Sequence, residues 1–169
     1  MQRMKILQKN HKTLRAKAID LPLEDIGSKK IQTLLNNMKK VLDDCPDGAA
    51  LAAPQIGVSL RIFVVSQKIF MDDEGLIPDS SKDLVFINPE LKKISKRHKK
   101  LEEGCLSVRG YFGEIERAEK ATVEAYNEFG QKFSYAGSGL MAQIFQHELD
   151  HLDGILFIDK AKNLAKVDF

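Results

Sequence analysis

The most constraining feature of the sequence is a change in its hydrophobic period near the C-terminal end. Residues 121–137 alternate apolar and polar side chains on either side of a turn at 127–130, which predicts a β-hairpin. After Gly139 the alternation stops, and residues 140–152 (LMAQIFQHELDHL) follow the period of a helix, about 3.6 residues per turn. The sequence therefore predicts an α+β domain in which this helix packs against a sheet.

Two of the four histidines lie on one face of the predicted helix. His147 and His151 are four residues apart, so both can reach one cation at metal–nitrogen distances of about 2 Å. Glu148 lies about 100° further round the axis, which suits a base that acts on water better than a third ligand. Leu140 and Ile144 share the histidine face, so we expect that face to point inward. The HExxH pattern predicts metal-assisted hydrolysis; the alternative is an acidic surface helix that carries histidines.

A catalytic metal site also needs a third protein ligand and an open position. Because the residues after His151 include no His, Cys or Glu, we expect the third ligand upstream. Cys105 is the strongest candidate, since a thiolate is a soft, strong ligand and the preceding Gly104 lets the backbone approach the site. A buried structural thiol is the alternative for Cys105. Cys45 has no partner at ligand spacing, and we expect it to be inert.

Composition excludes other classes of protein. The 169 residues are 43% hydrophobic and carry a net charge of +2, which predicts a single globular domain, 1–169, and argues against DNA binding. No run approaches the roughly 18 apolar residues that a membrane helix needs. We therefore expect no membrane contact and a cytoplasmic location. A basic N-terminus without acidic residues leaves an organelle as the alternative.

Further elements are predicted before the hairpin. Residues 28–45 predict a helix capped by Ser28. The runs 61–66 and 84–87 are β-branched and aromatic and predict strands. The helix carries an apolar stripe that makes it amphipathic: Ile31, Leu34, Leu35, Met38, Val41 and Leu42.

Three motifs together resemble the signature of the peptide deformylase family. They are GAALAAPQIG (48–57), EGCLS (103–107) and QHELDHLDG (146–154), in that order. The resemblance implies antiparallel sheets packed around the C-terminal HExxH helix, with the amphipathic helix before the first motif. It also implies a metal-dependent hydrolase that removes the N-formyl group from the initiator methionine of nascent polypeptides and releases formate.

The resemblance implies roles for residues of the second and third motifs. Cys105, His147 and His151 would bind one divalent metal ion. The family implies Fe²⁺, whereas the ligand set also suits Zn²⁺, and Ni²⁺ or Co²⁺ can substitute. Water activated by the metal and by Glu148 as general base would attack the formyl carbon, and Glu148 would then pass the proton to the leaving amine.

Other residues would support this chemistry. The family stabilises the oxyanion with a glutamine amide and with the backbone N–H that follows the cysteine, which here are Gln55 and Leu106. Arg117 and Asp150 would form an ion pair beneath the helix, and Gln146 would help to hold the same ligands in place. A loop residue is the alternative for Gln55, and an exposed pair the alternative for Arg117.

The substrate would be an N-formylmethionyl peptide. By position, Ala49, Leu140 and Ile144 are candidates to line an apolar pocket for the methionine side chain, with plain core packing as the alternative. The peptide backbone would pair along Ala50 and along Gly104 as an added strand.

Two positions depart from the family pattern. Ala50 stands where a second glycine is usual, and its methyl group could crowd the peptide. Arg109 stands where proline is usual and places a flexible cation at the mouth of the site. We expect retained hydrolysis with an altered substrate preference.

Three functional hypotheses follow, and the deformylase is favoured. An HExxH metallopeptidase or amidase is disfavoured because no downstream ligand is present. A catalytically silent deformylase-like protein that binds nascent chains is disfavoured because Glu148 and all three ligand residues are intact. The basic segment 92–100 (KKISKRHKK) allows transient ribosome contact, but lysines that protect a solvated strand edge are the favoured interpretation.

Overall fold

In the computed structural model, which describes residues 4–167, the hairpin gives way to a helix at Gly139. Strand β7 (Lys132–Ser138) ends just before this residue, and helix α2 (Leu140–Leu152) begins just after it. Gly139 has a φ of 57°, which glycine adopts without the steric cost that a side chain would bring. The change in hydrophobic period therefore coincides with a backbone turn that only glycine makes easily.

The strands form two antiparallel sheets. In the described residues, one sheet has the order β1-β2-β3-β6-β7 and the other has the order β4-β5-β8. Strand β1 is thus an edge strand of the larger sheet. The bounds of the other strands are β1 (Ala50–Ala52), β2 (Ile62–Val65), β3 (Leu84–Ile94), β4 (His98–Gly104), β5 (Tyr111–Ala118), β6 (Lys120–Tyr126) and β8 (Lys162–Lys166).

Two α-helices and several 3-10 turns complete the described chain, and the α+β prediction is confirmed. Helix α1 (Lys29–Asp43) begins at Ser28, whose side chain accepts a hydrogen bond from the backbone N–H of Ile31 at 3.3 Å. Its predicted apolar stripe is buried except for Val41, which is half-buried. The 3-10 turns are Lys12–Leu14, Leu23–Asp25, Ala53–Ile56, Gln67–Phe70 and Phe157–Asp159.

Strand β2, next to the edge strand β1, is buried on both faces. Phe63 and Val65 belong to a core shared with α2, whereas Ile62 and Val64 belong to a core shared with α1. Because successive side chains of a strand point to opposite faces, this explains why residues 62–65 are all apolar instead of alternating. Phe86 stacks on Phe63 with 4.6 Å between ring centroids, which joins β2 to β3 in the α2 core.

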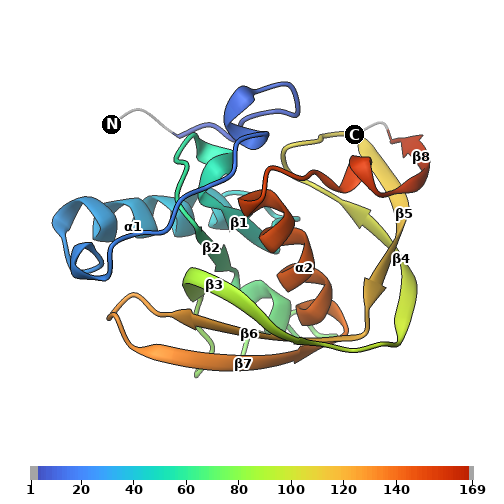
Figure 1. The fold of residues 1–169 in the computed structure, drawn as a ribbon. Coiled ribbons are helices and arrows are strands. Elements are labelled where there is room, and N and C mark those ends of the chain that lie inside the picture. Colours follow the sequence, from blue (N-terminus) through green and yellow to red (C-terminus); the bar gives the residue numbers. More distant parts are fainter. Residues whose placement is uncertain (1–3, 168–169) are drawn as a thin grey trace.

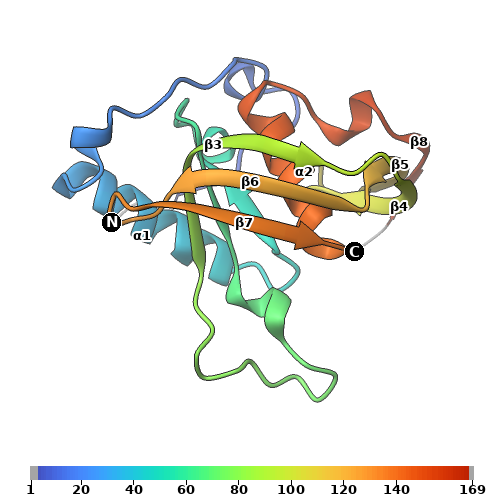
Figure 2. The ribbon, with the colours of Figure 1, turned by 60° about the horizontal axis from the view of Figure 1, so that its bottom comes forward.

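Helix α2 lies between the two sheets, with β3, β6 and β7 on one side and β4, β5 and β8 on the other (Figure 1). It contacts β1, β6 and β7 of the larger sheet and β5 of the smaller one. Figure 2 shows the helix behind the β3-β6-β7 layer, with α1 further along the same sheet. The end of β4 is therefore brought close to a helix that follows it by some forty residues.

Two predictions about these elements need correction. Strand β3 does not end at residue 87 but continues to Ile94, because its pairing with β6 continues past Glu90 although the side chains there are exposed. Leu140 was expected to face the interior, but it is 52% exposed because it starts α2 where the helix emerges at the surface.

The basic residues 92–100 are nearly all exposed, at the end of β3 and the start of β4. Neither helix described in residues 4–167 is long and apolar enough to cross a membrane.

Candidate metal centre

Helix α2 carries three polar side chains that are buried or nearly so. Glu148 and His151 are 3% and 1% exposed, and His147 is slightly more accessible. The two imidazole rings have centroids 4.9 Å apart, as expected for residues one helical turn apart. The apolar neighbours Ile144 and Phe145 pack the helix into the core, which forces this polar face toward the end of β4.

Cys105 follows the last residue of β4 and completes the cluster. Its Sγ atom lies 3.3 Å from Nε2 of His151, and one ligand atom from each of Cys105, His147 and His151 lies within 4.8 Å of the other two. The backbone N–H of Ser107 donates to the same Sγ at 3.4 Å. A thiolate with two imidazoles is a ligand set that suits a divalent transition metal.

Two buried polar atoms beside this cluster lack a partner within residues 4–167, and the carboxylate oxygen among them supports a cation there. In the described chain, Oε2 of Glu148 and Nδ1 of His151 are buried without a hydrogen-bond partner. An unsatisfied buried polar group costs about 1–3 kcal/mol of stability. An occupied site would offset part of this cost, because a water or ligand there could contact the Glu148 carboxylate. The residues present therefore fit a metal ion.

A buried ion-pair network holds His147. Glu103 accepts a hydrogen bond from Nδ1 of His147 at 2.8 Å through its Oε2. The guanidinium of Arg117 donates to both oxygens of Glu103, at 2.6 and 3.1 Å. Arg117 also donates to Asp150 at 2.9 Å, and the Nζ of Lys160 reaches Asp150 from the surface at 3.1 Å. The predicted pair of Arg117 and Asp150 is thus part of a longer chain of contacts that ends on a candidate ligand.

The network determines which nitrogen of His147 faces the site. Burial alone would raise the pKa of Glu103, but hydrogen bonds from His147 and Arg117 outweigh burial and lower this pKa to about 2. An ionised carboxylate only accepts hydrogen bonds, so Nδ1 of His147 must carry the proton that it shares with Glu103. The other nitrogen, Nε2, is left for a metal, which is the usual arrangement for a histidine ligand.

Glu148 differs from Glu103 although both are buried. Burial raises the pKa of Glu148 to about 7, and nearby carboxylates oppose the cations that would lower it. Its Oε1 lies 4.0 Å from Nε2 of His147, beside the position that a cation would take. A carboxyl group with a pKa near neutrality can both accept and return a proton.

Gln55 is held rigidly by the short 3-10 turn Ala53–Ile56. Its Oε1 accepts from the backbone N–H of Ala52 at 2.9 Å, which directs the amide nitrogen the other way. That Nε2 donates to Oγ of Ser107 at 3.0 Å and lies 3.7 Å from Sγ of Cys105. The side chain is 1% exposed and also lines the pocket beside the cluster.

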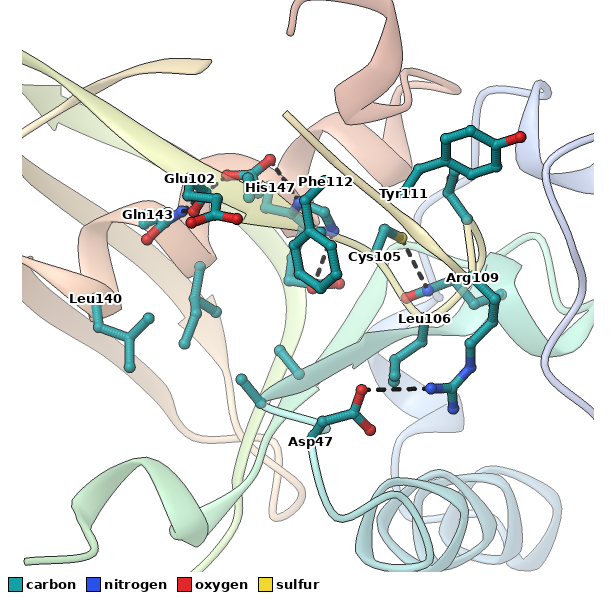
Figure 3. A pocket seen from close by; sticks show the side chains of 18 of the residues that line it. Asp47, Glu102, Cys105, Leu106, Arg109, Tyr111, Phe112, Leu140, Gln143 and His147 are labelled. Atoms are coloured by element: carbon teal, nitrogen blue, oxygen red, sulfur yellow. Dashed lines mark hydrogen bonds and ion pairs between the residues drawn. The ribbon is translucent and has the colours of Figure 1, made fainter. Parts of the chain in front are cut away.

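A pocket of about 290 Å³ opens beside the cluster (Figure 3). Ile144 is buried in its wall, whereas Leu140 is exposed at its edge. Figure 3 shows Leu140 at one side of the pocket and Cys105 and Arg109 at the other, with Asp47 below them. All five predicted substrate residues line it: Ala49, Ala50, Gly104, Leu140 and Ile144.

Gly104 has a packing role as well. It pairs in register with Phe112 of β5, and a Cβ atom on Gly104 would lie 2.6 Å from Cε1 of that ring. Only glycine therefore allows the phenyl ring, which lines the pocket, to lie where it does.

The segment that carries Leu106 is fastened from outside the motif. Gln8 donates from its Nε2 to the carbonyl of Leu106 at 3.1 Å, and its Oε1 accepts from the backbone N–H of Arg109 at 3.3 Å. Gln146 similarly fastens α2 to β5, since it accepts from the N–H of Ala118 at 2.9 Å and donates to the carbonyl of Ala118 at 3.0 Å.

The structure adds residues to the site that sequence reasoning missed. Four residues contact the predicted ones: Glu103, Ser107, Asp47 and Gln8. The first two belong to the EGCLS motif, but no role was predicted for them. A charged residue two positions before a candidate ligand, on the strand leading to it, was a usable signal for Glu103. No local pattern marks Gln8 or Asp47.

The fold and the cluster together define a class: an α+β protein with an HExxH helix and a candidate metal centre whose third ligand would be a cysteine. The profile of the polypeptide deformylase family matches residues 3–167. The chain therefore belongs to the peptide deformylase family, whose members are metal-dependent enzymes.

Individual peptide deformylases are similar to this chain over most of its length. A peptide deformylase of Dehalococcoides mccartyi strain CBDB1 is 44% identical over 146 residues, which are 86% of this chain and 78% of the relative. The crystal structure of a peptide deformylase from Legionella pneumophila is 40% identical with a TM-score of 0.80, and the match covers 94% of this chain and 86% of that one. A class I type b peptide deformylase from Acinetobacter baumannii, solved with Met-Ala-Ser bound, is 30% identical with a TM-score of 0.82. That match covers 93% of this chain and 97% of the other.

Proposed function

We propose that this chain hydrolyses the formamide bond of N-formylmethionyl peptides, releasing formate and a free amino terminus. The observation that carries the proposal is the meeting of Cys105 with the HExxH residues His147 and His151 in a family whose members are peptide deformylases. The Met-Ala-Ser peptide bound to the Acinetobacter relative is consistent with a substrate that begins with methionine.

Cys105, His147 and His151 would hold one divalent ion, and we propose Fe²⁺ with Zn²⁺, Ni²⁺ or Co²⁺ as alternatives. When bound, such an ion supplies Lewis acidity and lowers the pKa of water in the site. Glu103 would keep Nε2 of His147 directed at the ion through its contact with Nδ1. Arg117 and Asp150 would hold Glu103 and the helix in that position.

Glu148 would move the proton. As water adds to the formyl carbon, its proton passes to the Glu148 carboxylate; a C–O bond forms while the carbonyl π electrons move onto the formyl oxygen. The same proton then passes to the leaving nitrogen as the oxyanion electrons re-form the C=O bond and the C–N bond breaks, which releases formic acid that ionises to formate. The burial of Glu148 and its unpartnered Oε2 support this role, because no structural contact occupies that oxygen in the described chain.

Gln55 and Leu106 would stabilise the negative charge on the formyl oxygen. The Gln55 amide nitrogen is directed toward the cluster by the bond from the N–H of Ala52 to its Oε1, so its donor requires no reorientation during the reaction. Gln8 holds the carbonyl of Leu106 and so limits the movement of the neighbouring peptide groups. Preorganised donors of this kind lower the barrier because no reorganisation is needed when charge develops.

The pocket would bind the methionine side chain and the peptide backbone. Ile144 supplies a buried apolar wall, Ala49 lies partly buried beside it, and the exposed Leu140 would cover the side chain from the rim. Strand β1 has a free edge in the described sheet, so a peptide could pair along Ala50 as an added strand, with Gly104 on the facing side. Ala50 and Arg109 would change substrate preference without preventing hydrolysis.

The proposal extends to the whole chain and to its location. We take residues 1–169 as one catalytic domain, supported by the match over residues 3–167. A cytoplasmic location, where formylated chains emerge from ribosomes, agrees with the substrate. The exposed basic residues 92–100 are the segment on which transient ribosome contact would depend.

The test is formate release from formyl-Met-Ala-Ser by protein purified without oxygen and loaded with Fe²⁺, compared with Glu148→Ala. We expect turnover by the wild type and its loss in the variant. Absence of formate from the metal-loaded wild type contradicts the proposal. Cleavage of unformylated peptides would indicate a metallopeptidase, and tight peptide binding without turnover would indicate a silent binder.

A further inference from the structure

We propose that Arg109, paired with Asp47, makes the enzyme prefer substrates that carry a carboxylate one or two residues after the formylmethionine. This inference rests on the proposed deformylase function. It concerns a position where the chain departs from the family pattern, and it assigns the substituted residue a chemical preference.

The two side chains meet at the pocket mouth from distant segments. Nη1 of Arg109 lies 3.3 Å from Oδ2 of Asp47, and both residues line the pocket. Asp47 follows α1, whereas Arg109 follows the end of β4, so the pair connects two walls of the pocket (Figure 3). The side chains are 46% and 55% exposed, which leaves them open to an incoming peptide.

The position of the pair relative to β1 gives the part of the substrate that it would meet. The inner end of β1 is Ala52, which binds Gln55 beside the metal cluster. A peptide that pairs along Ala50 must leave the site in the opposite direction, past Ala49 toward Asp47. A strand advances about 3.3 Å per residue, so residues one or two beyond the methionine arrive beside the pair.

The Arg109 guanidinium can bind an anion in addition to Asp47. Arg109 has five N–H donors; Nη1 contacts Asp47, Nη2 makes a long contact of 3.9 Å with Sγ of Cys45, and the remaining donors can serve a ligand. Elsewhere on the pocket, Nζ of Lys9 is 4.9 Å from the centroid of the Tyr111 ring, which lines it. The other acidic group on the rim, Glu102, lies at the far side of the pocket (Figure 3). Arg109 therefore offers N–H donors to a carboxylate where the peptide would leave the groove.

The backbone beneath Arg109 is held in place, although its side chain is exposed. The N–H of Arg109 donates to Oε1 of Gln8, a bond that a proline at this position could not make. The guanidinium is therefore presented from a fixed base. Because an exposed ion pair is weak, a substrate carboxylate can join or replace Asp47 at little cost.

The experiment compares formyl-Met-Ala-Glu-amide with formyl-Met-Ala-Gln-amide, and formyl-Met-Glu-Ala-amide with formyl-Met-Gln-Ala-amide. In wild type we expect kcat/KM to favour Glu over Gln by about two- to fivefold at one position or both, through KM. The ratio should fall to one in Arg109→Gln, be partly retained in Arg109→Lys and increase in Asp47→Asn. Salt at about 0.5 M should reduce it, since exposed charges are screened.

A second measurement does not depend on turnover. Calorimetric affinities of the deformylated peptides Met-Ala-Glu-amide, Met-Glu-Ala-amide and their Gln counterparts should show the same preference and the same loss in Arg109→Gln. A Glu-to-Gln ratio of one in wild type, or a ratio that Arg109→Gln leaves unchanged, overturns the inference while formate release still supports the proposed function. If no peptide yields formate with metal-loaded protein, the proposed function fails, and with it this inference about substrates.

Discussion

Two arginine–carboxylate pairs lie near the metal centre, and they differ in burial. Arg117 and Glu103 are 3% and 5% exposed and share two hydrogen bonds, the shorter of 2.6 Å. Arg109 and Asp47 are 46% and 55% exposed and share one contact of 3.3 Å. The first pair lies beneath a candidate ligand, whereas the second lies at the mouth of the pocket.

Burial changes what each pair can do. A buried pair that loses one partner leaves an uncompensated charge in a medium that solvates it poorly, so its geometry is enforced. An exposed pair is screened by water and salt and is worth about 0–1 kcal/mol, so it can exchange partners. The buried pair is suited to fix His147, and the exposed pair is suited to meet substrates of varied charge.

The largest effect should come from Glu148, which is buried like Glu103 but, within residues 4–167, forms no ion pair with an arginine or lysine. We expect Glu148→Gln to lower kcat for formate release by about 10²–10⁴, because proton transfer is lost while shape is kept. Steady-state kinetics with metal content measured on the same sample tests this. Glu116→Gln, on the exposed face of β5, is the matched control. A loss below about tenfold at full metal content would contradict the role of Glu148.

The next effect tests the buried pair. Arg117→Met should lower the free energy of unfolding by about 3–5 kcal/mol, because Glu103 would remain buried without its cation. Urea denaturation measures the change, with Arg97→Met as the control, since the Arg97 side chain is 84% exposed. Adding Glu103→Leu to Arg117→Met should recover part of the loss. If Arg117→Met and Arg97→Met have equal free energies of unfolding, the buried pair does not stabilise the fold more than an exposed arginine does.

A smaller effect is expected at the contact between Glu103 and His147. Glu103→Gln keeps an oxygen acceptor but removes the charge, so metal affinity should fall about 10- to 100-fold. Competition with a chromogenic chelator under anaerobic conditions gives the affinity. Glu102→Gln is the matched control, because this neighbour is exposed and points to the pocket instead of the ligand. If both variants bind metal equally, Glu103 does not position His147.

The smallest effect is expected at the exposed pair. Arg109→Gln and Asp47→Asn should each change the free energy of unfolding by at most about 1 kcal/mol, with a coupling energy near the lower end of that range. A double-mutant cycle in urea, at low and at high salt, measures it. A coupling above that range that persists in high salt would mean that the pair stabilises the fold and that its contrast with the buried pair is false.

Local patterns in the sequence determined much of what could be predicted. The period of residues 140–152 indicated α2, and the spacing of His147 and His151 indicated two ligands on one face, because helix geometry depends on sequence separation alone. Because residues 152–169 contain no His, Cys or Glu, the sequence indicated an upstream third ligand, Cys105. The three motifs indicated the family. Ser28 likewise marked the start of α1 through a contact within one turn.

The partners of these residues were decided only by the tertiary structure. Glu103 and His147 are 44 residues apart, and Asp47 and Arg109 are 62 apart, so no local period relates them. Their contacts depend on how α2 lies between two sheets and on the register of β4 against β5. Leu140 has an apolar side chain at a helical position, yet it is exposed because the helix emerges from the core at that turn. Sequence spacing determines which face a side chain occupies, whereas packing determines what that face meets.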